Sequence, residues 1–303
     1  MAQESLARAT RNKNDEFYTL YEDIEKELVH YIDYLKDKVV YCNCDDYRMS
    51  NFWKYFMNNF TKYQLKGLVA TGYNKDGRGI MATYYGEEVY STELEGDGDF
   101  QSEECINILK KCDIVITNPP FSKIRYLIPL LFEHQKDFIL LGNCLCVGDK
   151  DIFPYIFHNK LFLGSSKQNV YSFMTDSGEI KKIQGIVWLQ TLKFFDKRLE
   201  LTESYSPEKY PRYDNYDAIE VGRTKLIPKD YNGKMGVPVT FLDYYNPEQF
   251  ELIGVLNDFG YGSYNPADGI LIGTPTKVKN KNKHKGPVLN GRCVMQRLII
   301  RKR

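Results

Sequence analysis

Short apolar segments alternate with amphipathic helical segments along the first half of the chain. Four of the apolar segments are expected to be buried strands: Val39–Cys42, Gln64–Ala70, Asp113–Thr117 and Phe138–Leu141. Apolar spacing, together with Ser50 and Ser102 as capping residues, indicates helices at 15–35, 51–60, 102–111 and 123–134. Such alternation is typical of a parallel sheet with helices on both faces, so the sequence predicts an α/β protein.

After about Leu192 this alternation stops. Residues 196–235 are rich in Tyr, Asp, Lys and Pro and contain several turn signals. Short strands are expected further on: Val237–Leu242, Phe250–Leu256, Ile270–Ile272 and Gln296–Ile300. The sequence therefore predicts one domain at 1–195 that holds the sheet, and a smaller mixed α/β or β-rich region at 196–303.

The charges of the chain are unevenly distributed. The 303 residues carry 41 Lys or Arg and 40 Asp or Glu, a net charge of +1. Ten of the basic residues and no acid lie in 277–303, so the first 276 residues hold 31 basic and 40 acidic residues and carry a net charge of −9. This asymmetry favours contact between the C-terminal segment and a polyanion, although a solvated basic face is the ordinary alternative.

Several classes of protein are excluded by composition. No apolar run approaches the roughly 18 residues of a membrane helix, and the N-terminal segment lacks the apolar region of a signal peptide. We therefore expect a cytoplasmic protein with no membrane partner. The seven Cys are an odd number, and the pairs Cys42/Cys44 and Cys144/Cys146 are spaced too closely for a typical zinc site, so we expect no metal.

The most specific motif, Asn118-Pro119-Pro120-Phe121, directly follows a predicted strand. The carboxyl ends of parallel strands are where α/β sheets bind ligands. An Asn side-chain oxygen and a neighbouring carbonyl can accept both hydrogens of a planar amino group, which localises the nitrogen lone pair for attack on a methyl sulfonium. Prolines hold these acceptors rigidly, and the aromatic ring can stack on a base drawn out of its helix. A plain Pro-Pro turn with a buried Phe is the alternative.

Four segments in order, 14–19, 41–46 with 50–52, 96–100 and 118–121, resemble the EcoRI-like family of adenine-specific DNA methyltransferases. Weaker similarity follows at 235–241 and 245–248. The resemblance implies a Rossmann-like class I methyltransferase sheet that binds S-adenosylmethionine and catalyses transfer within 1–195. It also implies a target-recognition region at 196–303.

The resemblance assigns seven residues to the cofactor: Phe17, Tyr18, Thr19, Asn43, Asp45, Asp99 and Phe100. The first three pack against its methionine end, and Asn43 and Asp45 hold its amino-acid moiety. Asp99 accepts from the amino group of its adenine beside the ring of Phe100. An ordinary helix start, a solvated turn and an acidic surface loop are the respective alternatives. The chain departs from the general methyltransferase pattern because it has no glycine between Tyr41 and Asn51. No acid ends the second strand, so the ribose partner stays unassigned.

The resemblance implies methyl transfer to the N6 amino group of a flipped adenine in DNA, with Asn118, Pro119, Pro120 and Phe121 as the catalytic residues. S-adenosylhomocysteine is the other product. Seven basic residues are expected to contact phosphates: Lys277, Lys279, Lys281, Lys283, Lys285, Arg292 and Arg297. We expect a monomer, with a restriction endonuclease as a functional partner. An RNA or protein-glutamine amino-methyltransferase on the same fold, or a non-catalytic cofactor- or DNA-binding module, are the alternatives.

Overall fold

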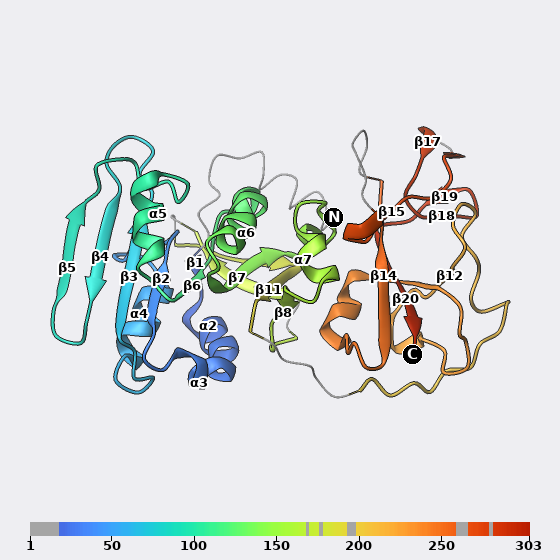
Figure 1. Ribbon diagram of the computed structural model, residues 1–303, viewed down its shortest axis with the longest axis horizontal. Helices are drawn as coiled ribbons and strands as arrows, with labels where there is room; N and C mark the ends of the chain where they lie inside the picture. The colour runs from blue at the N-terminus through green and yellow to red at the C-terminus, as the bar shows by residue number, and fades with distance from the viewer. Residues whose placement is uncertain (1–17, 168–169, 176–177, 193–197, 259–265, 279–280) are drawn as a thin grey trace. The chain divides into compact units, whose positions relative to one another are not determined.

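The computed structural model describes residues 18–167, 170–175, 178–192, 198–258, 266–278 and 281–303 (Figure 1). The predicted site residues Phe17 and Lys279 lie outside the described residues, and the side chains of Lys281 and Lys283 are not described. The chain divides into two units. The first comprises Met1–Asn143 and Leu163–Leu192, and the second comprises Cys144–Phe162 and Lys193–Arg303.

An eight-stranded mixed sheet, in the order β5-β4-β3-β2-β6-β7-β11-β8, contains all four strands predicted in the first half of the chain. The predicted strands are β2 (Val39–Cys42), β3 (Gly67–Gly72), β6 (Ile114–Thr117) and β7 (Asp137–Asn143), and they run parallel to one another. The α/β class is therefore confirmed.

The outer strands make the sheet mixed rather than parallel throughout. The remaining strands are β4 (Ile80–Tyr84), β5 (Val89–Glu93), β8 (Phe162–Leu163) and β11 (Ile186–Gln190). Strands β4 and β5 form an antiparallel hairpin whose first strand is also antiparallel to β3, and β11 is antiparallel to β7. A short turn can join only antiparallel strands, which explains the direction of β5.

The helices of the first unit lie close to their predicted positions. They are α2 (Tyr21–Leu28), η1 (Val29–Tyr31), α3 (Ile32–Leu35), α4 (Asn51–Asn59), α5 (Glu103–Lys110), η2 (Phe121–Lys123) and α6 (Ile124–Glu133). Both predicted caps are present, because the Ser50 hydroxyl accepts from the N–H groups of Phe52 and Trp53, and the Ser102 hydroxyl accepts from that of Cys105.

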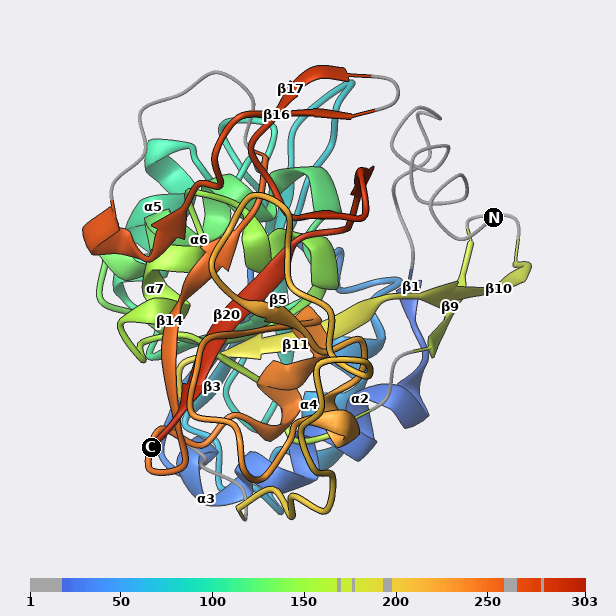
Figure 2. The ribbon, with the colours of Figure 1, turned by 90° about the vertical axis from the view of Figure 1, so that its right-hand side faces the viewer.

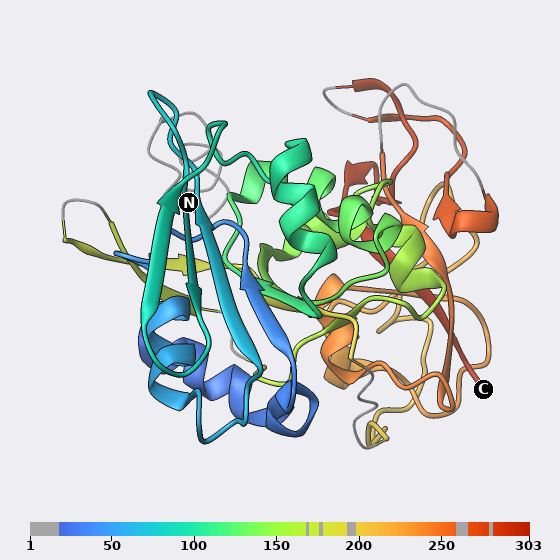
Figure 3. The same ribbon diagram turned by 60° about the vertical axis from the view of Figure 1, so that its left-hand side comes forward.

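Helices cover both faces of the central strands (Figure 3). Successive side chains of a strand point to opposite faces. On β2, Val40 and Cys42 belong to the core cluster that also contains Phe52 and Phe56 of α4. The buried Tyr41 lies between them on the strand and is close to Cys105 of α5. The two helical layers hold the carboxyl end of β2 in a fixed position.

A three-stranded antiparallel sheet pairs β1 (Tyr18–Thr19) with β9 (Val170–Met174) and β9 with β10 (Ile180–Gln184) (Figure 2). The buried Glu27 of α2 supports this part of the unit. Its carboxylate accepts from the backbone N–H groups of Ser165 (2.8 Å) and Ser166 (2.7 Å) and from the Tyr31 hydroxyl. These bonds tie the segment after β8 to α2.

The second unit contains a five-stranded sheet in the order β12-β13-β20-β14-β15. These strands are β12 (Ile219–Glu220), β13 (Met235–Val237), β14 (Phe250–Leu256), β15 (Ile270–Leu271) and β20 (Arg297–Lys302). Two smaller antiparallel pairs are β16 (Thr276–Val278) with β17 (Lys281–His284), and β18 (Val288–Leu289) with β19 (Arg292–Cys293). The remaining elements are η3 (Cys144–Gly148), α7 (Phe153–Phe157), η4 (Thr224–Leu226), η5 (Val239–Tyr244) and η6 (Pro266–Asp268).

One predicted strand of this unit is wrong. Only Val237 of the segment Val237–Leu242 lies in a strand, as the last residue of β13, and η5 follows. The physical reason is Pro238, which has no N–H to donate to a strand ladder. The other three predicted strands of the C-terminal region are confirmed as β14, β15 and β20.

The division of the chain at residue 195 stays a prediction. The chain passes between the two units after Leu192, and the second unit also includes the segment Cys144–Phe162. Within that segment α7 packs against β14, a contact between residues far apart in the sequence. Among the described residues, no helix is long and apolar enough to cross a membrane.

Candidate functional site

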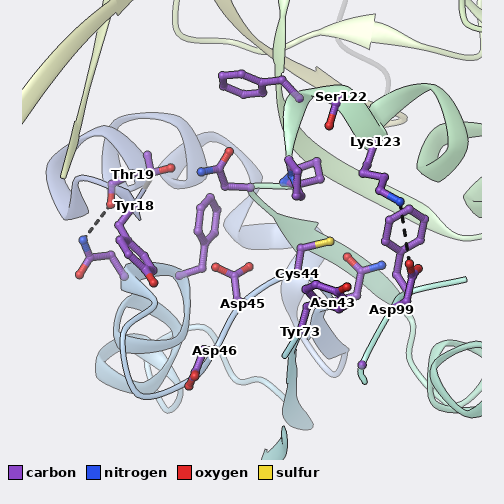
Figure 4. Close-up of a pocket in the computed structure, with 18 residues that line it drawn as sticks. Tyr18, Thr19, Asn43, Cys44, Asp45, Asp46, Tyr73, Asp99, Ser122 and Lys123 are labelled. Atoms are coloured by element: carbon purple, nitrogen blue, oxygen red, sulfur yellow. Dashed lines mark hydrogen bonds and ion pairs between the residues drawn. The ribbon is translucent and has the colours of Figure 1, made fainter. Parts of the chain in front are cut away.

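A cavity of about 270 Å³ lies in the first unit, where β1, the segments after β2 and β6, and the segment before α5 come together (Figure 4). It is lined by all ten described residues that the sequence assigns to catalysis and the cofactor: Tyr18, Thr19, Asn43, Asp45, Asp99, Phe100, Asn118, Pro119, Pro120 and Phe121. The fold thus brings together four segments that are separated by up to about a hundred residues.

The Asn-Pro-Pro-Phe segment leaves the sheet at the end of β6. Thr117 and Pro119 are buried, and Pro120 has an extended backbone (φ −52°, ψ 126°) before the turn η2 begins at Phe121. The ring of Phe121 meets that of Phe173 on β9 edge to face, with 6.3 Å between ring centroids. Two prolines and a packed ring restrict the conformations available to this segment.

Asp45, in the segment after β2, is buried, with 8% of its surface exposed. One carboxylate oxygen accepts from the Ser50 hydroxyl at 2.7 Å, the other accepts from the Thr117 hydroxyl at 2.5 Å, and the backbone N–H of Asn118 also donates to the group. Burial raises the pKa of the Asp45 carboxyl to about 6, and these hydrogen bonds act in the opposite direction.

Oγ1 of Thr19 and Oδ1 of Asn43 are buried side-chain oxygens at the border of the cavity, and each lacks a hydrogen-bond partner among the described residues. The backbone carbonyls of the same two residues are occupied, because Asn51 Nδ2 donates to that of Thr19 (2.8 Å) and the Thr71 hydroxyl donates to that of Asn43 (3.3 Å). Buried polar atoms are nearly always hydrogen-bonded in native proteins, so these two oxygens indicate a polar ligand with donor groups.

Asp99 follows a turn that requires glycine. Gly98 has φ +84°, and a Cβ there would lie 2.6 Å from the carbonyl oxygen of Gly72. Oδ1 of Asp99 accepts from the Gln101 N–H at 2.9 Å, and Oδ2 lies 3.9 Å from Nζ of Lys123. Figure 4 shows Asp99 and Lys123 facing each other at one side of the cavity. The carboxylate of Asp99 is thus held in place by a short-range backbone bond.

Several lining residues were not identified from the sequence: Cys44, Asp46, Asn51, Phe52, Tyr73, Gly98, Ser122 and Lys123. Some had a sequence signal, because Ser122 and Lys123 directly follow the Asn-Pro-Pro-Phe segment and Gly98 directly precedes Asp99. Asn51 lies in the segment 50–52 that carries the resemblance, but no local pattern shows its contact with the Thr19 carbonyl, which joins positions 32 residues apart.

The four predicted DNA-binding residues whose side chains the structure describes differ in exposure. Lys277 and Arg292 are exposed, and Lys285 is half-buried. Arg297 is mostly buried and paired with Glu220, with 2.8 Å between its guanidinium and the carboxylate. Glu220 also accepts from the hydroxyl of the buried Tyr213, and burial raises the pKa of that hydroxyl.

The cysteines of the first unit are free thiols, and burial raises the pKa of Cys42 well above its ordinary value. In the part of the chain that the structure describes, no group of three or more His, Cys, Asp or Glu side chains is arranged to hold a metal ion.

Comparison with known proteins gives a consistent set of matches. A family model described as adenine-specific methyltransferase EcoRI matches residues 5–92 and 79–303. The chain is 43% identical to the Type II methyltransferase M.EcoRI of Escherichia coli, with 82% of this chain and 88% of that protein covered. It is 40% identical to M.MgeORF184P of Mycoplasma genitalium and to M.MpnI of Mycoplasma pneumoniae, both named Type II methyltransferases, with 82% of this chain and 85% of each relative covered. No solved structure shows a significant match.

Proposed function

Because the chain belongs to the family of the adenine-specific methyltransferase EcoRI, we propose that it transfers a methyl group from S-adenosylmethionine to the N6 amino group of adenine in DNA. The observation that carries this proposal is the single cavity lined by the whole Asn-Pro-Pro-Phe segment and by six residues predicted for the cofactor. Direct transfer requires donor and acceptor in one site. S-adenosylhomocysteine is the second product.

The polar groups of the cavity suit this cofactor. Asn43 and Thr19 offer buried acceptor oxygens to its ammonium group, and the ring of Tyr18 adds apolar surface beside them. Asp99 offers a carboxylate to the amino group of its adenine, beside the buried Phe100. When bound, S-adenosylmethionine supplies an electrophilic methyl group on a sulfonium.

The Asn-Pro-Pro-Phe segment acts on the target base. The side-chain oxygen of Asn118 and the carbonyl of Pro119 accept the two amino hydrogens, which makes the nitrogen lone pair available for attack. The new nitrogen–carbon bond forms as the carbon–sulfur bond breaks, and the amino group then loses a proton to solvent. Phe121 stacks on the adenine, which has to leave the duplex stack to reach a cavity of this kind.

The order of the parallel strands, β3-β2-β6-β7 with the antiparallel β11 beyond, supports a Rossmann-like class I methyltransferase arrangement for the first unit. Target recognition is assigned to the region 196–303, whose exposed Lys277 and Arg292 are suited to phosphates. We further propose a monomer located in the cytoplasm, with a restriction endonuclease as its functional partner. The Type II names of the relatives favour that partner.

The role of Asn118 is tested by the variant Asn118→Ala. We expect methyl transfer to fall at least about 1000-fold, because the acceptor that activates the amino group is gone, while the dissociation constant of S-adenosylmethionine stays within about threefold. Transfer is measured with methyl-labelled cofactor and DNA, and cofactor binding by calorimetry. Asn107→Ala, on the exposed face of α5, is the matched control and keeps wild-type rates. Full activity of Asn118→Ala contradicts the assignment.

The substrate is tested separately. The protein is expressed in a bacterial host without DNA methylation, and the DNA is read by modification-sensitive single-molecule sequencing. We expect N6-methyladenine within one sequence context. In parallel, labelled methyl groups are traced into DNA, RNA and protein fractions. Label confined to RNA or to protein would replace the proposed function with the corresponding amino-methyltransferase activity, and absence of cofactor binding would favour a non-catalytic module.

A further inference from the structure

We propose that Asp45 is a positioning residue for methyl transfer: its carboxylate fixes the backbone at Asn118 and so sets where the Asn118 acceptor meets the target amino group. The inference rests on the proposed function, and it adds a role that cofactor binding alone does not require.

The carboxylate of Asp45 joins two elements of the site. Thr117, the last residue of β6, and Asn118, the first residue after it, both donate to Asp45, the former at 2.5 Å through its hydroxyl and the latter through its backbone N–H. These donors come from adjacent residues, so the carboxylate binds the point where the chain turns out of the sheet. Hydrogen bonds to a buried charged group are among the stronger ones in proteins.

A second hydrogen bond of the Thr117 hydroxyl strengthens its connection to the segment after β2. The Thr117 hydroxyl, which donates to Asp45, also accepts from the backbone N–H of Cys44 at 3.3 Å. The segment after β2 and the end of β6 are therefore connected twice through one hydroxyl group. Loss of that hydroxyl would release both connections at once.

Asp45 is itself held by groups that do not move with the Asn-Pro-Pro-Phe segment. Its N–H donates to the Thr71 carbonyl on β3 at 3.0 Å. Its second oxygen accepts from the Ser50 hydroxyl at 2.7 Å, and the same hydroxyl caps α4 by accepting from the N–H groups of Phe52 and Trp53. The anchor is thus part of the sheet and of a helix end.

The backbone chemistry of the motif makes this anchor necessary. Pro119 and Pro120 have no N–H, so they cannot be tied to the protein by backbone donation. The N–H of Asn118 is the last backbone donor before Phe121. A hydrogen bond donated by this N–H is therefore the nearest backbone donor contact that can fix the backbone at Asn118.

The predicted cofactor role of Asp45 and the positioning role have different kinetic consequences. If Asp45 mainly holds the cofactor, the variant Asp45→Asn weakens S-adenosylmethionine binding and reaches the wild-type kcat when cofactor is saturating. If Asp45 positions Asn118, the variant binds the cofactor as the wild type does but has a lower kcat. A displacement of the Asn118 acceptor by about 1 Å can lower the rate by about 100-fold.

The test uses the full chain and the variants Asp45→Asn, Thr117→Val and Thr117→Ser. We expect Asp45→Asn and Thr117→Val to lower kcat by about 10- to 100-fold, with the dissociation constant of S-adenosylmethionine within about threefold of the wild type. Thr117→Ser keeps the hydroxyl, so its kcat is expected to be close to that of the wild type. If Thr117 acted only through the packing of its methyl group, Thr117→Ser would also lower kcat. Asn and Val keep nearly the shapes of Asp and Thr, and thermal unfolding checks that each variant is folded.

A second readout does not depend on activity. The hydrogen-exchange rate of the Asn118 amide, followed by NMR, is expected to rise at least about tenfold in Asp45→Asn. An unchanged exchange rate would overturn the inference, as would wild-type kcat with weakened cofactor binding. If wild-type protein does not methylate DNA, the proposed function fails, whereas the exchange measurement still decides whether Asp45 anchors Asn118.

Discussion

At Asp45, burial and hydrogen bonding act in opposite directions on one carboxyl group. Burial alone disfavours the charged form, while the donors from Thr117, Ser50 and Asn118 stabilise it. Burial is the larger effect, because the pKa is raised from the ordinary 3.8 to about 6. The group is therefore ionised at neutral pH at a cost in folding free energy, an arrangement more typical of functional sites than of protein cores.

This cost predicts a pH dependence of stability. Since the folded pKa lies above the unfolded one, the stabilising contribution is complete below the unfolded pKa and is lost as the pH rises through about 6. The stability of the wild type relative to Asp45→Asn is expected to fall by about 2 kcal/mol between about pH 4.5 and about pH 7.5. Denaturant unfolding of both proteins at several pH values measures the difference. A constant difference across this range would contradict the expectation.

The residues proposed to act on the target base were more predictable from the sequence than the contacts proposed to position them. Asn118 stands in a motif whose residue types have a chemical reason to be adjacent. The resemblance assigns Asp45 to the cofactor, which stays a prediction, whereas its contact with Thr117 could not be predicted because it joins positions 72 residues apart. Contacts of this kind depend on the packing of β2 beside β6, which no local pattern contains.

At the scale of elements, the segment between β5 and α5 depends on one glycine. Gly98 has a left-handed backbone and lies against the Gly72 carbonyl, at the end of β3. This close approach sets the position of the next residue, Asp99, at the cavity.

We expect Gly98→Ala to lower the free energy of unfolding by about 2 kcal/mol, because Ala is strained at this φ and its Cβ meets a backbone oxygen. Affinity for S-adenosylmethionine should fall as well, since Asp99 moves with the turn. Denaturant unfolding and calorimetry measure the two effects. Gly96→Ala is the matched control, because a Cβ there has its nearest contact at 3.9 Å. Equal effects of the two variants would exclude the turn as the cause.

Elements with a strong local signal were predicted well. The caps Ser50 and Ser102 and the apolar strands before the Asn-Pro-Pro-Phe segment are all confirmed. Prediction failed at Val237–Leu242, where an apolar, β-prone segment contains Pro238. The pairing of β1 with β9 had no local signal in the sequence, because the two strands are about 150 residues apart. This pairing holds Tyr18 and Thr19, which line the cavity.

At the scale of the whole molecule, the near-zero net charge hides an acidic first part and a basic C-terminal segment. Replacing Lys277 and Arg292 with Gln is expected to reduce the slope of log affinity against log salt by up to about 2, because each phosphate contact contributes about 0.9. Fluorescence anisotropy with a labelled duplex at several salt concentrations gives the slope. Lys54→Gln, which removes an exposed charge on α4, is the control. An unchanged slope in the double variant would show that Lys277 and Arg292 do not contact phosphates and belong to a solvated basic face.

The path of the chain through its two units has a consequence for the order in which the protein forms. During synthesis α7 appears about a hundred residues before β14, the strand against which it packs. Synthesis proceeds at roughly 5 to 20 residues per second. On the order of 10 s therefore pass between the synthesis of α7, whose Phe153 and Ile156 are buried in the folded protein, and the synthesis of β14. Over the same interval β11 emerges and can pair with β7, so the sheet of the first unit can be completed before α7 meets β14.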